Sequence, residues 1–313
     1  MMANWRMRSF LDLLLLSVLQ PCFCIATKRD FPPNDYFVPS TLTVSLSQNY
    51  SINNVSPLQI LNDDVITVEF STSQVPSAND WIGAYAPGGI SNIPSTVPAK
   101  WGYCSSSPTY MSQGSGSIQF NMTNLRDDIA FYYFTGDTAD AILVASFSET
   151  VSFVNINQPL RNRIVATGDP NTYKFLWSSN SSLEPVLRWG LSSGTYSQTA
   201  PAFPSNIQRS SLCGSPANGT GWRNLGMIYT AFINGIVTMG LSNQYIYYSF
   251  GDASTSNWSP EFQFWVGPKV GENPPTRGTQ LILMADLGTA SYSTSEQTGK
   301  LKMNAPSVLL LNK

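Results

Sequence analysis

The sequence predicts a mainly β protein of two successive β-sandwiches, followed by the first strand of an incomplete α/β domain. Three observations support this fold class. Apolar and polar residues alternate along most of the chain, turn-rich segments separate the alternating runs, and no amphipathic helix of useful length occurs. Short strands at fairly regular spacing with polar turns are typical of β-sandwiches. A length of 313 residues is compatible with roughly two such domains.

The composition excludes several classes of function. Charged residues make up only 12% of the chain, and the formal net charge is -2. This charge gives no electrostatic reason to expect a nucleic-acid partner. The chain contains no histidine. It therefore cannot form a Ser-His-Asp or Cys-His catalytic pair, or complete a metal site with imidazole ligands.

The N-terminus has the pattern of a secretory signal peptide over residues 1–26. Arg6 and Arg8 form a basic start, residues 10–19 are mostly apolar, and small residues near Ala26 allow cleavage. A membrane anchor is the alternative, but the apolar run is too short to cross ~30 Å of hydrocarbon. We expect an extracellular protein with no membrane association after cleavage. Residues 27–40 are polar and proline-containing, which predicts a disordered leader.

The first predicted sandwich spans residues 41–157 and the second spans residues 158–268. Alternating runs in the first are residues 41–48, 65–71, 117–121, 129–135 and 141–147. The second contains strand patterns starting at residue 163 and at 172–177, 186–190, 227–232, 245–250 and 262–266. Its segment 240–248 resembles the turn and strand of a tyrosine corner, with Leu241 in the core and a tyrosine pinning the turn. We therefore expect a fibronectin-III-like second sandwich.

The sequence changes character after a proline-rich linker at residues 269–278. Residues 280–285 (Q-L-I-L-M-A) form a continuous apolar run, followed by Asp286 and Gly288. Both faces of such a strand must be covered, as in the central strand of an α/β domain. Only 25 residues follow Gly288. We therefore expect residues 279–313 to be the start of a domain that this sequence does not complete.

Asp286 is the candidate metal ligand. A carboxylate at the C-terminal end of a buried strand, just before a glycine turn, commonly faces the ligand crevice of an open α/β sheet. The alternative is a turn-forming aspartate without a ligand. Asp80, which precedes Trp81, is expected only to cap a turn.

Two further sets of residues are consistent with secretion. Cys104 and Cys213 remain after signal cleavage and are a candidate disulfide, with two free buried thiols as the alternative. The candidate N-glycosylation sites are Asn49, Asn54, Asn121, Asn180, Asn218 and Asn257. The sequons of Asn54 and Asn257 are the weakest because prolines follow their serines.

A long motif resembles the plant-type purple acid phosphatases, which belong to the metallophosphoesterase superfamily. Residues 213–226 read C-G-S-P-A-N-G-T-G-W-R-N-L-G, similar to the family pattern C-G-x-P-A-N-x-T-G-W-R-D-x-G, with Asn224 in place of aspartate. Supporting segments occur in the family's order at residues 80–87, 167–170, 186–190 and 245–252. The resemblance covers about residues 41–290 and therefore only the N-terminal portion of the long family members.

The resemblance implies a secreted, glycosylated enzyme that hydrolyses phosphate monoesters at acid pH. Family members use a dinuclear centre of Fe(III) and a divalent ion (Zn, Mn or Fe), and they often form homodimers. Their ligands come from five motif blocks, three of which contain histidine. Only the first block has a counterpart here, at residues 285–288. By this resemblance Asp286 corresponds to an Fe(III) ligand.

One carboxylate cannot hold two metal ions, so we expect no stoichiometric metal in this chain and no hydrolysis by it alone. It is either an incomplete product of a longer phosphatase gene or a short natural form. Whether it acts as an enzyme therefore stays open. Two other functions remain as alternatives. One is a non-catalytic secreted binding module, and the other is a fragment of a nucleotide pyrophosphatase or phosphodiesterase of the same superfamily.

Overall fold

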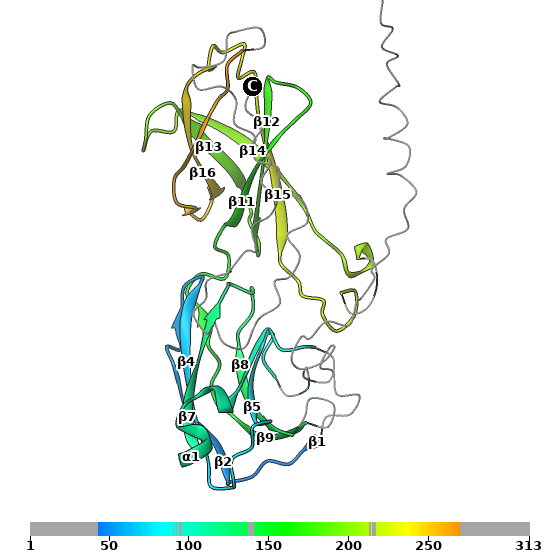
Figure 1. The fold of residues 1–313 in the computed structure, drawn as a ribbon. Coiled ribbons are helices and arrows are strands. Elements are labelled where there is room, and N and C mark those ends of the chain that lie inside the picture. Colours follow the sequence, from blue (N-terminus) through cyan, green and yellow to red (C-terminus); the bar gives the residue numbers. More distant parts are fainter. Residues whose placement is uncertain are drawn as a thin grey trace, which may run out of the picture.

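The computed structural model describes residues 43–89, 91, 93, 96–136, 141–212, 214 and 217–269. The predicted signal peptide, the whole leader, the linker apart from Lys269, and residues 279–313 lie outside this part. The described chain forms two β-sandwiches, one above the other in Figure 1. This confirms the predicted mainly β fold. Within the described residues, no helix has both the length and the apolar character of a membrane span.

The first sandwich contains two main sheets and one short ribbon. A five-stranded sheet has the order β1-β9-β8-β5-β6, a three-stranded sheet has the order β2-β4-β7, and β10 pairs with β3. The strands are β1 Thr43–Val44, β2 Tyr50–Ser56, β3 Gln59–Ile60, β4 Asp64–Thr72, β5 Trp81–Tyr85, β6 Lys100–Tyr103, β7 Ser115–Met122, β8 Ala130–Thr135, β9 Ile142–Ser146 and β10 Ser152–Phe153. The short helices η2 Cys104–Ser106 and α1 Tyr110–Gln113 connect β6 to β7.

The alternating strand β4 shows why these residues form a sandwich. Its residues Ile66, Val68 and Phe70 are all fully buried, while the alternate positions Val65 and Glu69 are exposed. Because side chains alternate between the two faces of a strand, these buried side chains lie on one face of the three-stranded sheet. This face packs against the five-stranded sheet. The burial of three large side chains on one strand supplies part of the hydrophobic driving force for this packing.

The five-stranded sheet is covered on both faces. All five residues of β5 are buried, as are the first five of β8. Trp81 and Phe134 stack on the second face with ring centroids 4.0 Å apart, and Ile93 from the loop after β5 packs into the same cluster. The sequence gives no sign of this second core, because the loop residue that covers it lies outside any alternating pattern.

The second sandwich is built around a strand that takes part in both layers. Its strands are β11 Leu160–Ala166, β12 Thr172–Ser179, β13 Pro185–Gly190, β14 Gln198–Ser205, β15 Met227–Asn234, β16 Tyr245–Asp252, β17 Asn257–Trp258 and β18 Phe262–Trp265. The order is β11-β12-β15-β14-β13-β16-β17, with β18 also on β16. β14 pairs with β13 through its first half and with β15 through its second half. It therefore joins the two layers.

The predicted tyrosine corner is present only in part. Leu241 is in the core as expected, with 6% of its surface exposed. Tyr245 does not pin the turn, because it is 48% exposed and its ring packs edge-on against Trp265. The buried tyrosine is Tyr248, whose hydroxyl accepts a hydrogen bond from Asn162 Nδ2 at 2.5 Å. Tyr245 pairs directly with Trp265, which is itself exposed, so both rings of this pair face solvent.

Candidate functional site

The predicted metal ligand and one predicted cysteine cannot be placed. Asp286 and Cys213 both lie outside the described residues. Cys104 is a free cysteine that is fully buried in the first sandwich. Burial raises the pKa of its thiol well above the usual range, so this side chain is a poor nucleophile. The pairing of Cys104 with Cys213 stays a prediction.

The candidate glycosylation sites differ in their exposure to solvent. Asn49, Asn54 and Asn121 are exposed, whereas Asn180, Asn218 and Asn257 are half-buried. Glycan attachment uses the side-chain nitrogen. In Asn257 this Nδ2 donates to Asn157 O at 2.9 Å, while its Oδ1 accepts from Asn155 Nδ2 at 2.8 Å. Both ends of the Asn257 amide therefore take part in the folded structure.

When the chain is produced in a secretory host, we expect Asn257 to remain unmodified and the exposed Asn49 to carry a glycan. The reason is that Asn257 Nδ2 is used in a hydrogen bond, whereas the Asn49 side chain is open to solvent. Glycopeptide mass spectrometry measures the occupancy of each sequon. The Asn49→Gln variant is the control for assigning its glycan. High occupancy at Asn257 in the folded protein would contradict this prediction.

Acidic residues in the described part do not assemble into a metal site. No group of three or more His, Cys, Asp or Glu side chains there is arranged to hold a metal ion. The one fully buried aspartate, Asp80, accepts hydrogen bonds from Tyr110 Oη, from Thr135 Oγ1 at 2.6 Å and from Ser77 N at 3.0 Å. Asp80 therefore caps the predicted turn through Ser77 N and also binds the core residues Tyr110 and Thr135, so its role is structural.

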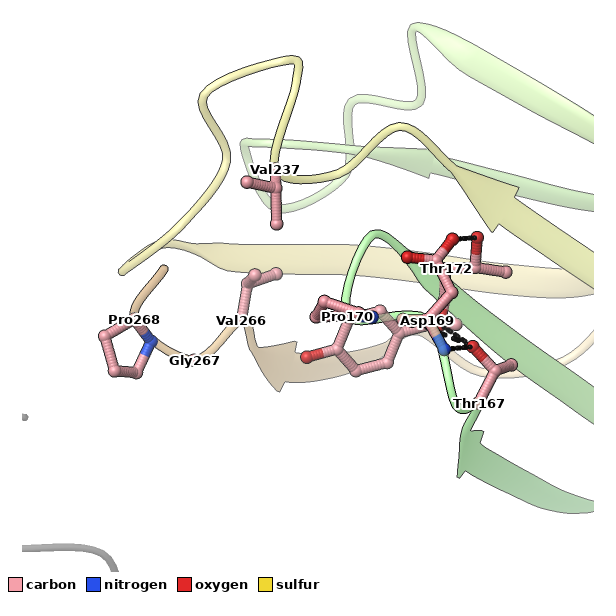
Figure 2. Close-up of a pocket in the computed structure, with 9 residues that line it drawn as sticks. Thr167, Asp169, Pro170, Thr172, Val237, Val266, Gly267 and Pro268 are labelled. Carbon is pink, nitrogen blue, oxygen red and sulfur yellow. Dashed lines mark hydrogen bonds between the residues drawn. The ribbon is translucent and has the colours of Figure 1, made fainter. Parts of the chain in front are cut away.

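A small open cavity lies at the end of the second sandwich where the described chain stops. It has a volume of about 110 Å³. Figure 2 shows its lining residues, which are Thr167, Asp169, Pro170, Thr172, Tyr173, Val237, Val266, Gly267 and Pro268. Asp169 accepts hydrogen bonds from Asn171 N at 2.9 Å and from Thr172 Oγ1 at 2.8 Å, and these lower the pKa of its carboxyl group. Asp169 is the only carboxylate among these lining residues, and none of them is a basic side chain that could act with it.

The most elaborate polar arrangement is the junction between the two sandwiches. In Figure 1 the connection from β14 to β15 extends toward the first sandwich. Arg223 in this connection donates from Nη1 to Ala86 O and from Nη2 to Val97 O, the latter at 2.5 Å. Val97 N donates in turn to Thr220 O at 3.2 Å. One guanidinium therefore links two carbonyl groups of the opposite sandwich.

The surroundings of Arg223 affect its charge in opposite directions. Burial lowers the pKa of Arg223, while the nearby groups Asp127 and Tyr85 act in the opposite direction. The same burial raises the pKa of Tyr85. Because an arginine remains charged under all ordinary conditions, its donors stay available to the two carbonyl groups.

A second arginine also links the two sandwiches. Arg126, only 6% exposed, donates from Nη1 to Ile156 O at 2.8 Å and Gln158 O at 2.7 Å, and from Nη2 to Ser178 O at 3.2 Å. Burial lowers its pKa to about 10, and Arg161 adds to this effect. The Asn155–Asn257 pair completes the junction. The hydrogen bonds of Arg223, of Arg126 and of the Asn155–Asn257 pair thus all link the two sandwiches.

Sequence reasoning found the segment around Arg223 but not its role. Residues 213–226 marked a family, and nothing in their pattern indicated that Arg223 crosses to another domain. The replacement of the usual aspartate by Asn224 keeps the local turn, because Asn224 Oδ1 accepts from Gly226 N at 3.0 Å. Gly226 has a φ of +80°, and a Cβ there would lie 2.4 Å from Ser179 O. An arginine within this motif, in a chain with few charged residues, was the one signal that the sequence offered.

Comparisons with known proteins agree with this architecture. The family model "Fn3-like domain from Purple Acid Phosphatase" matches residues 53–155. The match falls on the first sandwich, and the fibronectin-III-like character expected of the second sandwich stays a prediction.

Curated relatives come from Arabidopsis thaliana. "Probable inactive purple acid phosphatase 1" is 30% identical over 75% of this chain and 40% of its own length. "Probable inactive purple acid phosphatase 27" is 29% identical over 81% of this chain and 44% of its own length. The chain thus spans about two fifths of the length of these relatives.

A solved structure shows the same arrangement. Purple acid phosphatase PPD1 from yellow lupin (Lupinus luteus) seeds matches with a TM-score of 0.64 and 27% identity. The match covers 75% of this chain and 44% of the lupin chain. The chain is therefore a relative of the plant purple acid phosphatases and carries their Fn3-like domain.

Proposed function

We propose that this 313-residue chain is a non-catalytic, two-sandwich part of a purple acid phosphatase-type protein. In the family, by resemblance, a dinuclear Fe(III)–M(II) centre hydrolyses phosphate monoesters at acid pH. The observation that carries the proposal is the complete lack of histidine in the sequence. Three of the family's five ligand blocks need imidazole, and no other side chain supplies the same neutral nitrogen ligand. Two relatives whose names contain the words "probable inactive" are in keeping with this.

The positive role that we propose is structural. Arg223 and Arg126 bind backbone carbonyl groups across the junction, which opposes independent movement of the two sandwiches. Hydrogen bonds from a charged donor are worth about 1.5–3 kcal/mol each. The tandem sandwiches would then act as one rigid body that holds whatever part of the protein is attached to it.

The proposal also includes secretion of the chain after removal of residues 1–26. It treats Asp286 as the equivalent of an iron ligand by ancestry, without a metal in this chain. A single carboxylate and its neighbours lack the several ligands per ion that a dinuclear centre requires.

Metal analysis and a phosphatase assay test the proposal directly. We expect the purified chain to contain no stoichiometric iron, to show no visible absorption band, and to cleave p-nitrophenyl phosphate no faster than background at acid pH. The Asp286→Asn variant should be indistinguishable from the unmodified chain in both measurements. Stoichiometric iron with turnover that disappears in Asp286→Asn would overturn the proposal.

A further inference from the structure

An apolar stripe lies on the outer face of the strands β11, β12, β15 and β14, which are neighbours in one layer of the second sandwich (Figure 1). Side chains alternate along a strand, so Phe203 points away from the core that contains its buried neighbour Ala202. Phe203 is 62% exposed, Val165 is 43% exposed and Phe232 is 36% exposed. Exposed apolar patches of this kind usually mark an interaction surface.

The paired residues of this outer face form rows that cross the strands. The rows are Val165, Lys174 and Phe232, then Arg163, Leu176, Thr230 and Phe203, then Ser178, Ile228 and Ser205, with Thr172 and Asn234 at the far end. The two cations, Arg163 and Lys174, lie on β11 and β12, and none of these positions is acidic. Asp169 belongs to the turn between β11 and β12, where its carboxylate accepts hydrogen bonds within the turn. The face is therefore apolar across the strands and basic along one side.

None of the candidate N-glycosylation sites is among these positions. Asn54 and Asn121 lie on β2 and β7 of the first sandwich, and Asn257 lies on β17 at the other end of the strand order. Asn180 follows β12, and Asn218 lies in the connection from β14 to β15. No glycan can therefore be attached at the positions that form the face, which leaves its apolar side chains open to a protein partner.

The charges of the face indicate which partner fits. Arg163 pairs with Leu176, and Lys174 lies two residues before Leu176 on β12, so the two cations are diagonal neighbours about 7–8 Å apart. Acidic side chains at positions i and i+4 of a helix are about 5–6 Å apart and can reach both cations. A second copy of this chain would bring two further cations to the same face. A uniformly anionic membrane would not match cations that lie on one side only.

We propose that the outer face of β11-β12-β15-β14 binds an amphipathic helix of a partner protein. The apolar side of the helix covers Phe203 and Phe232, and its acidic flank lies beside Arg163 and Lys174. A helix about 10 Å wide fits along four strands that are together about 15 Å across. The rows extend over about 20 Å, which gives a face on the order of 300 Å² and matches a helix of about 14 residues. A face of this size is typical of a weak, transient partner.

Two synthetic peptides test this docking on the intact chain. Each is a helix of about 14 residues, held by a hydrocarbon staple, with leucines along one side. One peptide carries glutamates on the flank beside the leucines, and the other carries lysines there. Fluorescence anisotropy of the labelled peptides at low salt measures the two dissociation constants. We expect the glutamate peptide to bind at least about tenfold more tightly than the lysine peptide.

Variants of the face make the test specific. The double variant Arg163→Glu, Lys174→Glu should reverse the order of the two peptides, and this comparison within one variant does not depend on how much of it is folded. Phe203→Asp should weaken the glutamate peptide at least about tenfold. The matched control is Leu183→Asp, because Leu183 is 88% exposed outside this face. This control should leave both dissociation constants unchanged.

Several results would overturn the proposal. They are equal affinities of the two peptides, no saturable binding up to about 1 mM, and binding that Phe203→Asp leaves unchanged. Self-association in light scattering that Phe203→Asp abolishes would assign the face to a second copy instead. Flotation with phosphatidylserine vesicles that Phe203→Asp abolishes would assign it to a membrane. Iron analysis and the phosphatase assay do not involve this face, so the docking and the proposed non-catalytic role can fail separately.

Discussion

Replacing Asp80 by alanine is expected to lower the free energy of unfolding of the first sandwich by about 3 kcal/mol or more. Its carboxyl group accepts hydrogen bonds from Tyr110 and Thr135 as well as from Ser77 N. Alanine leaves these three donors without this acceptor, and each unsatisfied buried donor costs roughly 1–3 kcal/mol. The melting temperature should fall by more than about 10 °C.

The effect should spread to the tyrosine pair beside Asp80. Tyr110 Oη and Tyr133 Oη are 2.6 Å apart, and burial raises the pKa of both phenols. Loss of Asp80 removes one of the groups that orient these hydroxyls. Near-ultraviolet circular dichroism, which reports on tyrosine packing, should therefore change together with the melting curve.

Two variants make the Asp80 prediction specific. Asp80→Asn keeps the shape and one acceptor oxygen, so it should be destabilised less than Asp80→Ala. Glu149→Ala removes an exposed acidic side chain in the same sandwich and should leave the melting temperature within about 2 °C. If Asp80→Ala unfolds at the same temperature as Glu149→Ala, the hydrogen bonds to Asp80 do not stabilise the core.

The second large effect is expected for Arg223→Met, which should uncouple the two sandwiches. Methionine keeps a long apolar stem but cannot donate to Ala86 O or Val97 O. Two hydrogen bonds from a charged donor are lost, which weakens the junction by on the order of 3 kcal/mol. Calorimetry of the unmodified chain should show one unfolding transition, and that of Arg223→Met should show two. Small-angle scattering should show a larger radius of gyration for the variant.

Matched arginine variants complete this experiment. Arg223→Lys has one ammonium group in place of the planar fork, so it should give intermediate coupling. Arg209→Met removes an exposed arginine from the same connection, at the start of η4 Arg209–Ser211, and should behave like the unmodified chain. A single transition in Arg223→Met, at the temperature of Arg209→Met, would show that Arg126 and the Asn155–Asn257 pair suffice to hold the junction.

Much of the β architecture could be predicted because it depends on local alternation. The run that became β4 has a period of two, and its apolar positions Ile66, Val68 and Phe70 are the buried ones. Leu241 was likewise placed correctly in the core, because the turn before β16 has a recognisable pattern. Which tyrosine of residues 240–248 is buried could not be read from this pattern, because Tyr245 pairs with Trp265, which lies 20 residues further along the chain.

The junction could not be predicted in the same way. The motif of residues 213–226 identified relatives of this chain, yet its contact with Ala86 and Val97 joins residues more than 120 positions apart. Asp80 is similar: the sequence indicated a turn, while its partner Tyr110 lies 30 residues away on α1. Long-range hydrogen bonds of this type leave no local period in the sequence.

The sequence by itself determined the mainly β fold, the relationship to plant purple acid phosphatases, and the lack of imidazole ligands, since alternation, motifs and composition are properties of the chain alone. Only the tertiary structure decided that both faces of the five-stranded sheet are covered, that Arg223 binds across the junction, and that an apolar stripe remains on the second sandwich. The physical reason is that the burial of a side chain depends on which segments, distant in the sequence, come into contact. These contacts are determined by how the strands pair and how the loops pack in the folded protein.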